Sequence, residues 1–262
     1  MPNGLEIFRD HFADCTDSYA IIGGTACMKL FELAGEDFRR TRDIDLVLVF
    51  DSRGLDRGFC EKFWQFIRNG RYQSLNQGEK PPHLYRFSRP VAAGYPDLIE
   101  IFSPRPNLLG PVPGGGKIAK IPMDEDMSDL SAILLDDEVY SFVVSGKQVV
   151  DGLSVVSASH LIALKIIACS NLNALEIKHG RDKRNIRKHR ADIVRLCDIV
   201  DPDASVDLTD AIARQVRTFV DELLSSTGED GRGDEAEIQA AGVLSRLFNL
   251  ESLAGGASHR LV

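Results

Sequence analysis

One short stretch constrains the fold more than any other part of the chain. Tyr19–Ile22 is an apolar run that predicts a buried strand, and Gly23-Gly24-Thr25 interrupts it. Residues 26–33 then place apolar side chains at helical spacing, and Gly35 follows as a helix stop. Glycines after a strand let backbone N–H groups approach a ligand closely, and the start of a helix favours anions. The stretch therefore predicts a phosphate site, with Thr25 as N-cap or as a hydroxyl that contacts a phosphate.

A pair of carboxylates opens the next predicted strand. Asp43-Ile44-Asp45 precedes residues 46–50, which are β-branched and apolar enough for a central strand. Side chains alternate along a strand, so Asp43 and Asp45 share a face, and two positions span roughly 6.5–7 Å. Two carboxylates at that spacing can share a divalent cation, and Mg²⁺ takes its other ligands from water and substrate phosphates. A glycine turn alone, or an Asp-x-Asp at the end of a strand alone, is usually structural. The occurrence of both in this order within one strand–helix–strand unit favours a site for Mg²⁺ or Mn²⁺ and a nucleoside triphosphate.

A third acidic residue lies in another apolar segment, residues 95–103. Glu100 stands between Ile99 and Ile101, where an unpaired charge would be costly. Asp97 is the rival candidate, but three positions along a strand place it on the opposite face, and it follows Pro96 at the predicted strand start. We therefore expect Glu100 to be the third carboxylate, with Asp97 as the alternative.

The order of these motifs resembles a known family. Gly23-Gly24-Thr25, a helix, and then Arg40-Thr41-Arg42-Asp43-Ile44-Asp45 resemble the nucleotidyltransferase superfamily of DNA polymerase β, and within it the AbiEii-type toxins of type IV toxin–antitoxin pairs. The resemblance implies an α/β (α+β) fold, with a mixed sheet flanked by helices and a C-terminal helical domain. We expect a catalytic core over residues 1–155 and the helical domain over residues 156–262.

The resemblance also implies roles for individual residues. Asp43, Asp45 and Glu100 would be the catalytic and metal-binding carboxylates, and Gly23, Gly24 and Thr25 would hold the triphosphate. Residues 161–166 look like the family's helix after the core, whose lysine, here Lys165, reaches the nucleotide; a lysine snorkelling to solvent is the alternative. Lys188–Ile193 resembles a Lys-x-x-x-Asp-Ile pattern, so Asp192 would orient Lys165 near the nucleotide. The implied reaction is transfer of a nucleoside monophosphate from ATP, GTP or another triphosphate to an acceptor hydroxyl.

The acceptor is suggested by a basic segment. Residues 178–195 carry eight Lys/Arg against two Asp in a chain of net charge −8. Such a run is either a solvated helix face or a surface for RNA phosphates. The family interpretation favours RNA, such as tRNA, and a protein antitoxin as partner. A small-molecule acceptor, as in antibiotic nucleotidyltransferases, and a non-catalytic nucleotide-binding module are the alternatives.

Composition adds a few limits. No apolar run is long enough to span a bilayer, and five scattered cysteines predict reduced thiols in a cytoplasmic enzyme. Gly114-Gly115-Gly116-Lys117 lacks the spacing and the Ser/Thr of a P-loop.

Periodicity predicts the remaining elements. The predicted helices cover residues 1–18, 55–69, from 157, 207–225 and 235–250. The predicted strands cover residues 72–77, 83–88, 95–103, 118–121, 131–135, 138–144 and 147–150.

Overall fold

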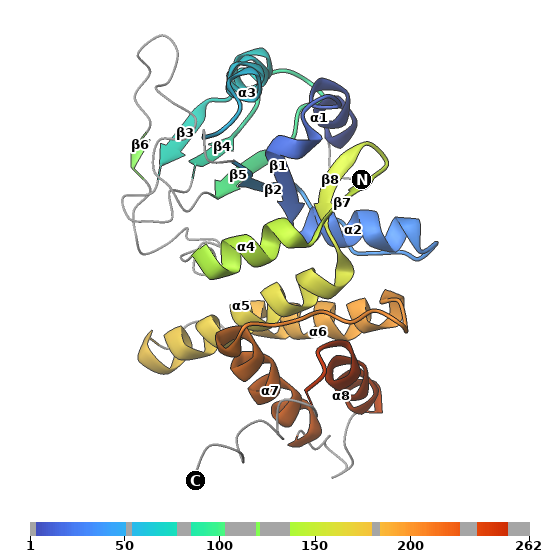
Figure 1. Cartoon of the computed structure of the whole chain (residues 1–262). Helices are drawn as coiled ribbons and strands as arrows, with labels where there is room; N and C mark the ends of the chain where they lie inside the picture. Colours follow the sequence, from blue (N-terminus) through green and yellow to red (C-terminus); the bar gives the residue numbers. More distant parts are fainter. Residues whose placement is uncertain are drawn as a thin grey trace. The chain divides into compact units, whose positions relative to one another are not determined.

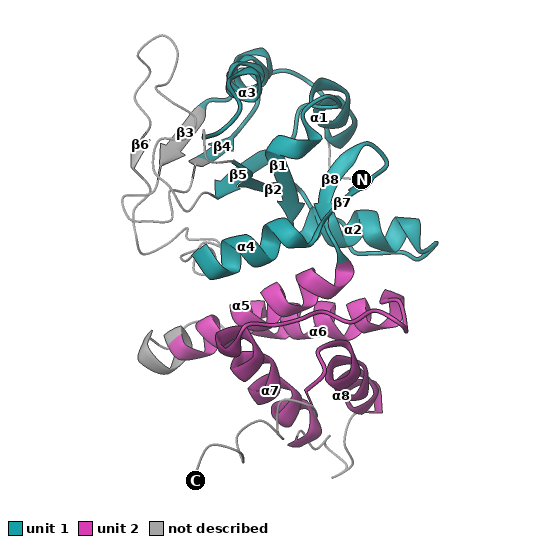
Figure 2. Cartoon of the chain, viewed as in Figure 1, with its two compact units in different colours: residues 1–157 teal, residues 158–262 magenta. Residues whose placement is uncertain are grey.

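A computed structural model of the chain describes residues 4–50, 54–77, 85–102, 119–120, 137–179, 184–225 and 235–250. These residues divide into two compact units, Met1–Ser157 and Ala158–Val262 (Figure 2). The change of unit falls where strand-forming residues give way to a long helical run. The strand expected over residues 131–135 and the loop around Gly114–Lys117 lie outside the described residues.

Within the described residues, the first unit contains one mixed sheet of eight strands. The strands are β1 Tyr19–Ile22, β2 Asp43–Leu48, β3 Ser74–Gln77, β4 Tyr85–Ser88, β5 Leu98–Phe102, β6 Ala119–Lys120, β7 Lys147–Val150 and β8 Leu153–Val156. Their spatial order is β6-β3-β4-β5-β2-β1-β8-β7. The central strand β2 is antiparallel to β1 and parallel to β5. This is the mixed sheet of an α/β fold, as the sequence predicted.

Helices cover both faces of this sheet. They are α1 Leu5–His11, the 3-10 turn η1 Thr16–Ser18, α2 Gly23–Leu33, α3 Arg57–Gly70 and α4 Asp137–Ser145. Figure 1 shows α1 and α3 on one face and α2 and α4 along the other. An aromatic core fills the first face: the ring of Tyr19 lies 5.6 Å from that of Phe8, and Phe87 lies 5.4 Å from Phe63. Because strand side chains alternate, Asp45, Glu100 and Arg86 belong to the opposite face.

Three elements differ from the sequence-based expectation. The helix predicted over residues 1–18 is only α1 followed by η1. Residues 138–144, predicted as a strand, belong to helix α4, so that prediction was wrong. Strand β8 was not predicted, although the sequence Asp151-Gly152 before it is a strong hairpin signal. Both residues have positive φ, 49° and 73°, as a two-residue turn with both central residues left-handed requires.

The described part of the second unit is helical. Its helices are α5 Ala158–His179, α6 Arg184–Ile199, α7 Asp210–Ser225 and α8 Glu235–Leu247. A paired contact ties α6 to α8: Arg190 donates from Nε and Nη2 to the two carboxylate oxygens of Glu237, at 2.5 and 2.8 Å. The Arg190 guanidinium also lies 5.8 Å from the ring centre of Phe219 in α7.

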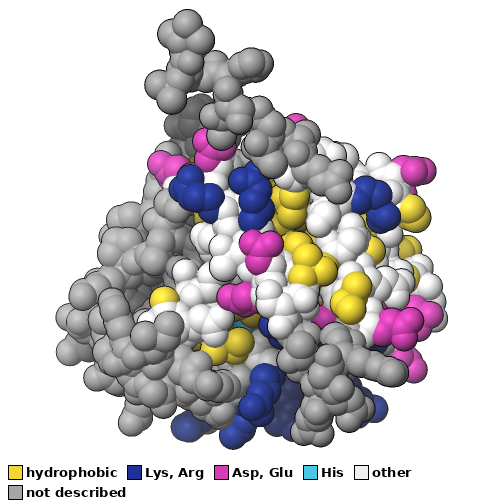
Figure 3. Space-filling model, turned by 90° about the horizontal axis from the view of Figure 1, so that it is seen from below, with side chains coloured by type: hydrophobic (Ala, Val, Ile, Leu, Met, Phe, Trp, Pro, Cys, Tyr) yellow, Lys and Arg dark blue, Asp and Glu magenta, His cyan; other side chains and the backbone are white. Residues whose placement is uncertain are grey.

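One face of the protein mixes both signs of charge. On the face drawn in Figure 3, basic and acidic side chains are interspersed around a small group of hydrophobic side chains. None of the described helices combines the length and the apolar character needed to cross a membrane.

Candidate active site

In the candidate site, helix α2 follows strand β1 directly. Helix α2 begins at Gly23, so no separate turn lies between it and β1. Gly23 has φ of 67°, a conformation that glycine adopts without the strain a Cβ would bring. The N-cap is Ile22, whose side chain has no acceptor for the first-turn N–H groups. The start of α2 therefore offers backbone donors beside the end of β1.

Thr25 connects two elements of the site. Of its two predicted roles, the N-cap was wrong, because Ile22 occupies that position, and the contact with phosphate stays a prediction. Thr25 is fully buried, and its hydroxyl donates to the backbone carbonyl of Asp43 at 2.5 Å. It thus ties the first turn of α2 to the start of β2, which holds the glycines next to the Asp-x-Asp pair.

Asp43 is held by the segment that leads into β2. Its Oδ1 accepts hydrogen bonds from the Thr41 hydroxyl at 3.3 Å and from the Arg42 backbone N–H at 3.0 Å. The side chain is half-buried. Local contacts therefore fix one carboxylate oxygen.

The sheet register brings the other two acids together. Asp45 of β2 is paired with Glu100 of β5, whereas Asp43 is opposite Leu98. Paired positions on neighbouring strands share a face, and neighbouring strands lie about 4.7–4.9 Å apart. Both side chains are buried: Asp45 is 5% exposed and Glu100 is 3% exposed. Asp97, the rival candidate, is exposed and precedes β5, so the register places Glu100 rather than Asp97 beside Asp45.

Arg86 of β4 completes this row of side chains, and sequence reasoning missed it. It is paired with Glu100 across the antiparallel strands, and its Nε lies 3.3 Å from Glu100 Oε1. Its side chain is 24% exposed. The available signal was an arginine next to the core residue Phe87 in a predicted strand, but only the register reveals its acidic partner.

The donor set fits a hard divalent cation. The three carboxylates offer only oxygen ligands, which Mg²⁺ and Mn²⁺ prefer. Among the described residues, no three His, Cys, Asp or Glu side chains converge as a complete metal site. A cation held here would thus take one or two carboxylates, chiefly from the adjacent pair Asp45 and Glu100, and complete its shell with water and phosphate oxygens. The three-carboxylate ligand set stays a prediction.

Among the neighbouring arginines, Arg39 lies nearest to the glycines. A Cβ built on Gly24 would meet the Arg39 Nη2 at 3.8 Å and the Thr41 hydroxyl at 2.9 Å. The Arg39 guanidinium also lies 5.1 Å from the ring centre of Phe38. Arg40 and Arg42 of the same segment are exposed. Arg39 is therefore an arginine of this segment that lies beside Gly24.

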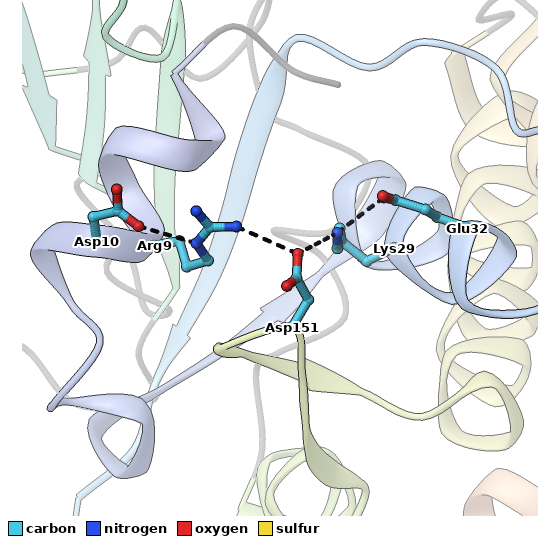
Figure 4. Close-up of polar contacts among 5 residues, drawn as sticks. All are labelled: Arg9, Asp10, Lys29, Glu32 and Asp151. Atoms are coloured by element: carbon cyan, nitrogen blue, oxygen red, sulfur yellow. Dashed lines mark hydrogen bonds and ion pairs between the residues drawn. The ribbon is translucent and has the colours of Figure 1, made fainter.

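Helix α2 is anchored on its far side by a charged network (Figure 4). Lys29, only 3% exposed, lies 2.9 Å from Glu32 and 3.0 Å from Asp151 in the turn between β7 and β8, and Arg9 of α1 lies 3.4 Å from the same Asp151 oxygen. Burial lowers the pKa of Lys29, but its hydrogen bonds to Glu32 and Asp151 outweigh this effect and raise it overall. The network fixes the helix whose first turn carries the glycines.

Two predicted nucleotide contacts belong to the second unit. Lys165 of α5 donates from Nζ to Asp192 Oδ2 of α6 at 2.8 Å. Both side chains are buried, at 4% and 5% exposed. The predicted pairing of the two residues is thus present, and Lys165 does not snorkel to solvent. Their contact with nucleotide stays a prediction.

Comparisons with known proteins give distant similarities. No protein-family profile and no curated protein matches the chain. Among solved structures, it is similar to an antigenic nucleotidyltransferase-like protein from Paracoccidioides brasiliensis, with 14% identity, a TM-score of 0.45, and coverage of 92% of this chain and 90% of that one. It is also similar to JHP933 from Helicobacter pylori, with 13% identity, a TM-score of 0.40, and coverage of 97% and 95%. Similarities at this level carry no argument about activity, which has to come from the residues of the site.

Proposed function

We propose that the protein is a nucleotidyltransferase that moves a nucleoside monophosphate from a nucleoside triphosphate to an acceptor hydroxyl. The observation that carries the proposal is the pairing of Asp45 with Glu100 beside the glycine start of α2. Buried carboxylates in register suit a divalent cation, and uncapped backbone N–H groups suit phosphate. The two features adjoin, because Asp45 is paired with Ile22, the residue just before Gly23.

Different residues bind the phosphates and activate the acceptor hydroxyl. The N–H groups at Gly23 and Gly24 hold β- or γ-phosphate oxygens, and Arg39 adds positive charge next to them. Asp43, Asp45 and Glu100 would hold Mg²⁺ or Mn²⁺, which neutralises the triphosphate and favours ionisation of the acceptor hydroxyl. Glu100 takes the proton of that hydroxyl. The acceptor oxygen then bonds to the α-phosphorus, the bond from that phosphorus to the bridging oxygen breaks, and pyrophosphate leaves. Lys165, set by Asp192, would neutralise charge on the pyrophosphate.

The first test is label transfer. The protein is incubated with Mg²⁺, total tRNA and each α-labelled nucleoside triphosphate in turn. We expect label in RNA with wild type and at least a hundredfold less with Asp45→Asn, roughly the loss seen when one electrostatic group of an active site is removed. Asp207→Asn, an exposed position in the second unit, serves as the matched control. Label in RNA that survives Asp45→Asn would contradict the assigned site.

Part of α6 supports RNA as the acceptor. Arg184, Arg187 and Lys188 are exposed at helical spacing that places them on one side, whereas Arg190 is engaged by Glu237. We expect Arg187→Gln/Lys188→Gln to weaken RNA binding and to reduce the slope of log affinity against log salt by roughly 0.7 for each lost phosphate contact. An unchanged slope would favour a small-molecule acceptor, which is then sought with the same labelled triphosphates. Triphosphate binding without transfer to any acceptor would favour a non-catalytic module.

A toxin role is the finer part of the proposal. It predicts that expression of the chain arrests growth of a bacterial host, that Asp45→Asn abolishes the arrest, and that a protein antitoxin relieves it. Growth arrest that persists with Asp45→Asn would separate toxicity from nucleotidyl transfer.

A further inference from the structure

A row of charged side chains crosses three neighbouring strands of the sheet. Arg86 of β4 is paired with Glu100 of β5, and Glu100 is paired with Asp45 of β2. The same row continues to Ile22 of β1, the residue just before Gly23. All of these positions share the sheet face opposite the aromatic core. Arg86 is therefore built into the same layer as the carboxylates rather than attached from a loop.

The charges in this row demand a counterion. Asp45 and Glu100 are 5% and 3% exposed, so water screens their mutual repulsion poorly. The Nε of Arg86 lies 3.3 Å from Glu100 Oε1. A guanidinium remains charged at every pH at which proteins fold, so it supplies a permanent positive charge. With Arg86 in place, the formal charge of the row is −1 instead of −2.

We propose that Arg86 is a built-in counterion that sets how strongly the Asp45–Glu100 pair binds a divalent cation. Arg86 is a positioning residue, and the inference rests on the proposed function of this carboxylate pair. A cation that approaches the pair must compete with Arg86 for Glu100 Oε1 and meets a positive charge beside it. Arg86 thus stabilises the pair before a cation arrives and weakens the binding of a bare cation.

Substrate binding follows from the same charge balance. A cation that arrives with a triphosphate brings several negative charges, which the positive charge of Arg86 attracts. Arg86 therefore disfavours the bare cation and favours the cation–triphosphate complex. Cation and nucleotide are expected to bind together, with each raising the affinity for the other.

The test measures Mn²⁺ binding without nucleotide, by calorimetry and by the electron paramagnetic resonance signal of free Mn²⁺. We expect Arg86→Gln to bind Mn²⁺ roughly tenfold more tightly than wild type, since one neighbouring charge commonly changes a buried interaction by about that factor. Arg86→Lys, which keeps the charge, should stay close to wild type. Arg68→Gln, an exposed arginine of α3, is the control and should change nothing.

Further comparisons keep the outcome decisive. If Arg86→Gln alone does not fold, Glu100→Gln is compared with Arg86→Gln/Glu100→Gln, in which both charges of the ion pair are removed. The double variant should then bind Mn²⁺ more tightly than Glu100→Gln, because the positive charge of Arg86 is absent from the row. Equal affinities in either comparison overturn the role of Arg86 and leave the proposed reaction standing. No Mn²⁺ binding by wild type or Arg86→Gln overturns both the inference and the cation part of the proposed function.

Discussion

At the residue scale, the candidate site depends on the missing side chains of its glycines and on the faces and partners of its charged residues. Gly23 has φ of 67° and Gly24 approaches Thr41 closely, so both positions favour glycine, whereas their contact with phosphate stays a prediction. The shared face of Asp43 and Asp45 followed from strand alternation alone. Arg86 required knowledge of the register, because its acid partner is 14 positions away in the sequence and on another strand. For Thr25, both roles of a threonine hydroxyl fit the same local pattern, so the sequence could not exclude the N-cap role that the structure contradicts.

Gly24 gives the sharpest residue-scale prediction. A methyl group there would lie 2.9 Å from the Thr41 hydroxyl and 3.2 Å from Thr41 Cβ. Thr41 is buried and donates to Asp43, so its displacement would disturb a site carboxylate. We expect Gly24→Ala to raise the KM for triphosphate and to lower stability by about 1–3 kcal/mol, as overpacking does. Enzyme kinetics and thermal denaturation measure the two effects.

The control for this substitution lies in another helix. A Cβ at Gly242 of α8 meets nothing within 4 Å, so Gly242→Ala should be neutral or stabilise by up to about 1 kcal/mol through helix propensity. If Gly24→Ala behaved like Gly242→Ala in both measurements, the close approach at Gly24 would affect neither triphosphate binding nor stability.

At the element scale, periodicity predicted most elements, and composition misled at α4. Residues 138–144 are rich in β-branched and aromatic side chains, which favours a strand assignment. The buried residues Val139, Phe142 and Val143 follow helical spacing instead, and Asp137 and Glu138 lie in the first turn, where acids favour a helix N-terminus. The period of the buried positions, rather than residue type, was the signal that decided this element.

The turn between β7 and β8 carries a pH-dependent contact. The hydrogen bond from Lys29 lowers the pKa of Asp151 below its ordinary value. A lowered folded-state pKa means that the contact stabilises the protein fully above the unfolded pKa, about 4 for aspartate, and is lost as pH falls through the lowered folded-state value. We expect Asp151→Asn to lower the Tm slightly at neutral pH, with the difference from wild type vanishing in acid.

Asparagine suits this test because it also tolerates positive φ, so the turn itself is preserved. The measurement is the Tm of both proteins from neutral pH down to about pH 3, which spans the ordinary aspartate pKa. Asp207→Asn corrects for general charge effects. A Tm difference that grows on acidification would show that the Lys29–Asp151 contact does not govern this turn.

At the scale of the whole molecule, the change from strand-forming to helical sequence after residue 157 could be read from the sequence. The contacts inside the helical unit could not be read from spacing. The apolar pattern of α5 suggested a buried side on which Lys165 was an exception. A charge there is compatible with folding because Asp192 of α6 supplies the opposite charge at 2.8 Å. The family resemblance suggested that pairing. Spacing alone could not, because 27 residues separate the two.

Variants of this pair test whether the two units unfold separately. Removing one partner leaves the other charge buried and uncompensated, so Lys165→Met should lower stability by about 3–5 kcal/mol. Lys165→Met/Asp192→Leu should recover most of that loss, because both charges are gone.

Two spectroscopic probes separate the units. The only tryptophan, Trp64 in α3, reports the first unit by fluorescence, whereas far-ultraviolet circular dichroism also follows the helices of the second unit. In urea, the dichroism transition of Lys165→Met should therefore move to lower concentration, and the Trp64 transition should move less. A Trp64 transition that moves by the full amount would mean that the chain unfolds as one cooperative body, and a double variant no more stable than Lys165→Met would contradict the assigned charge penalty.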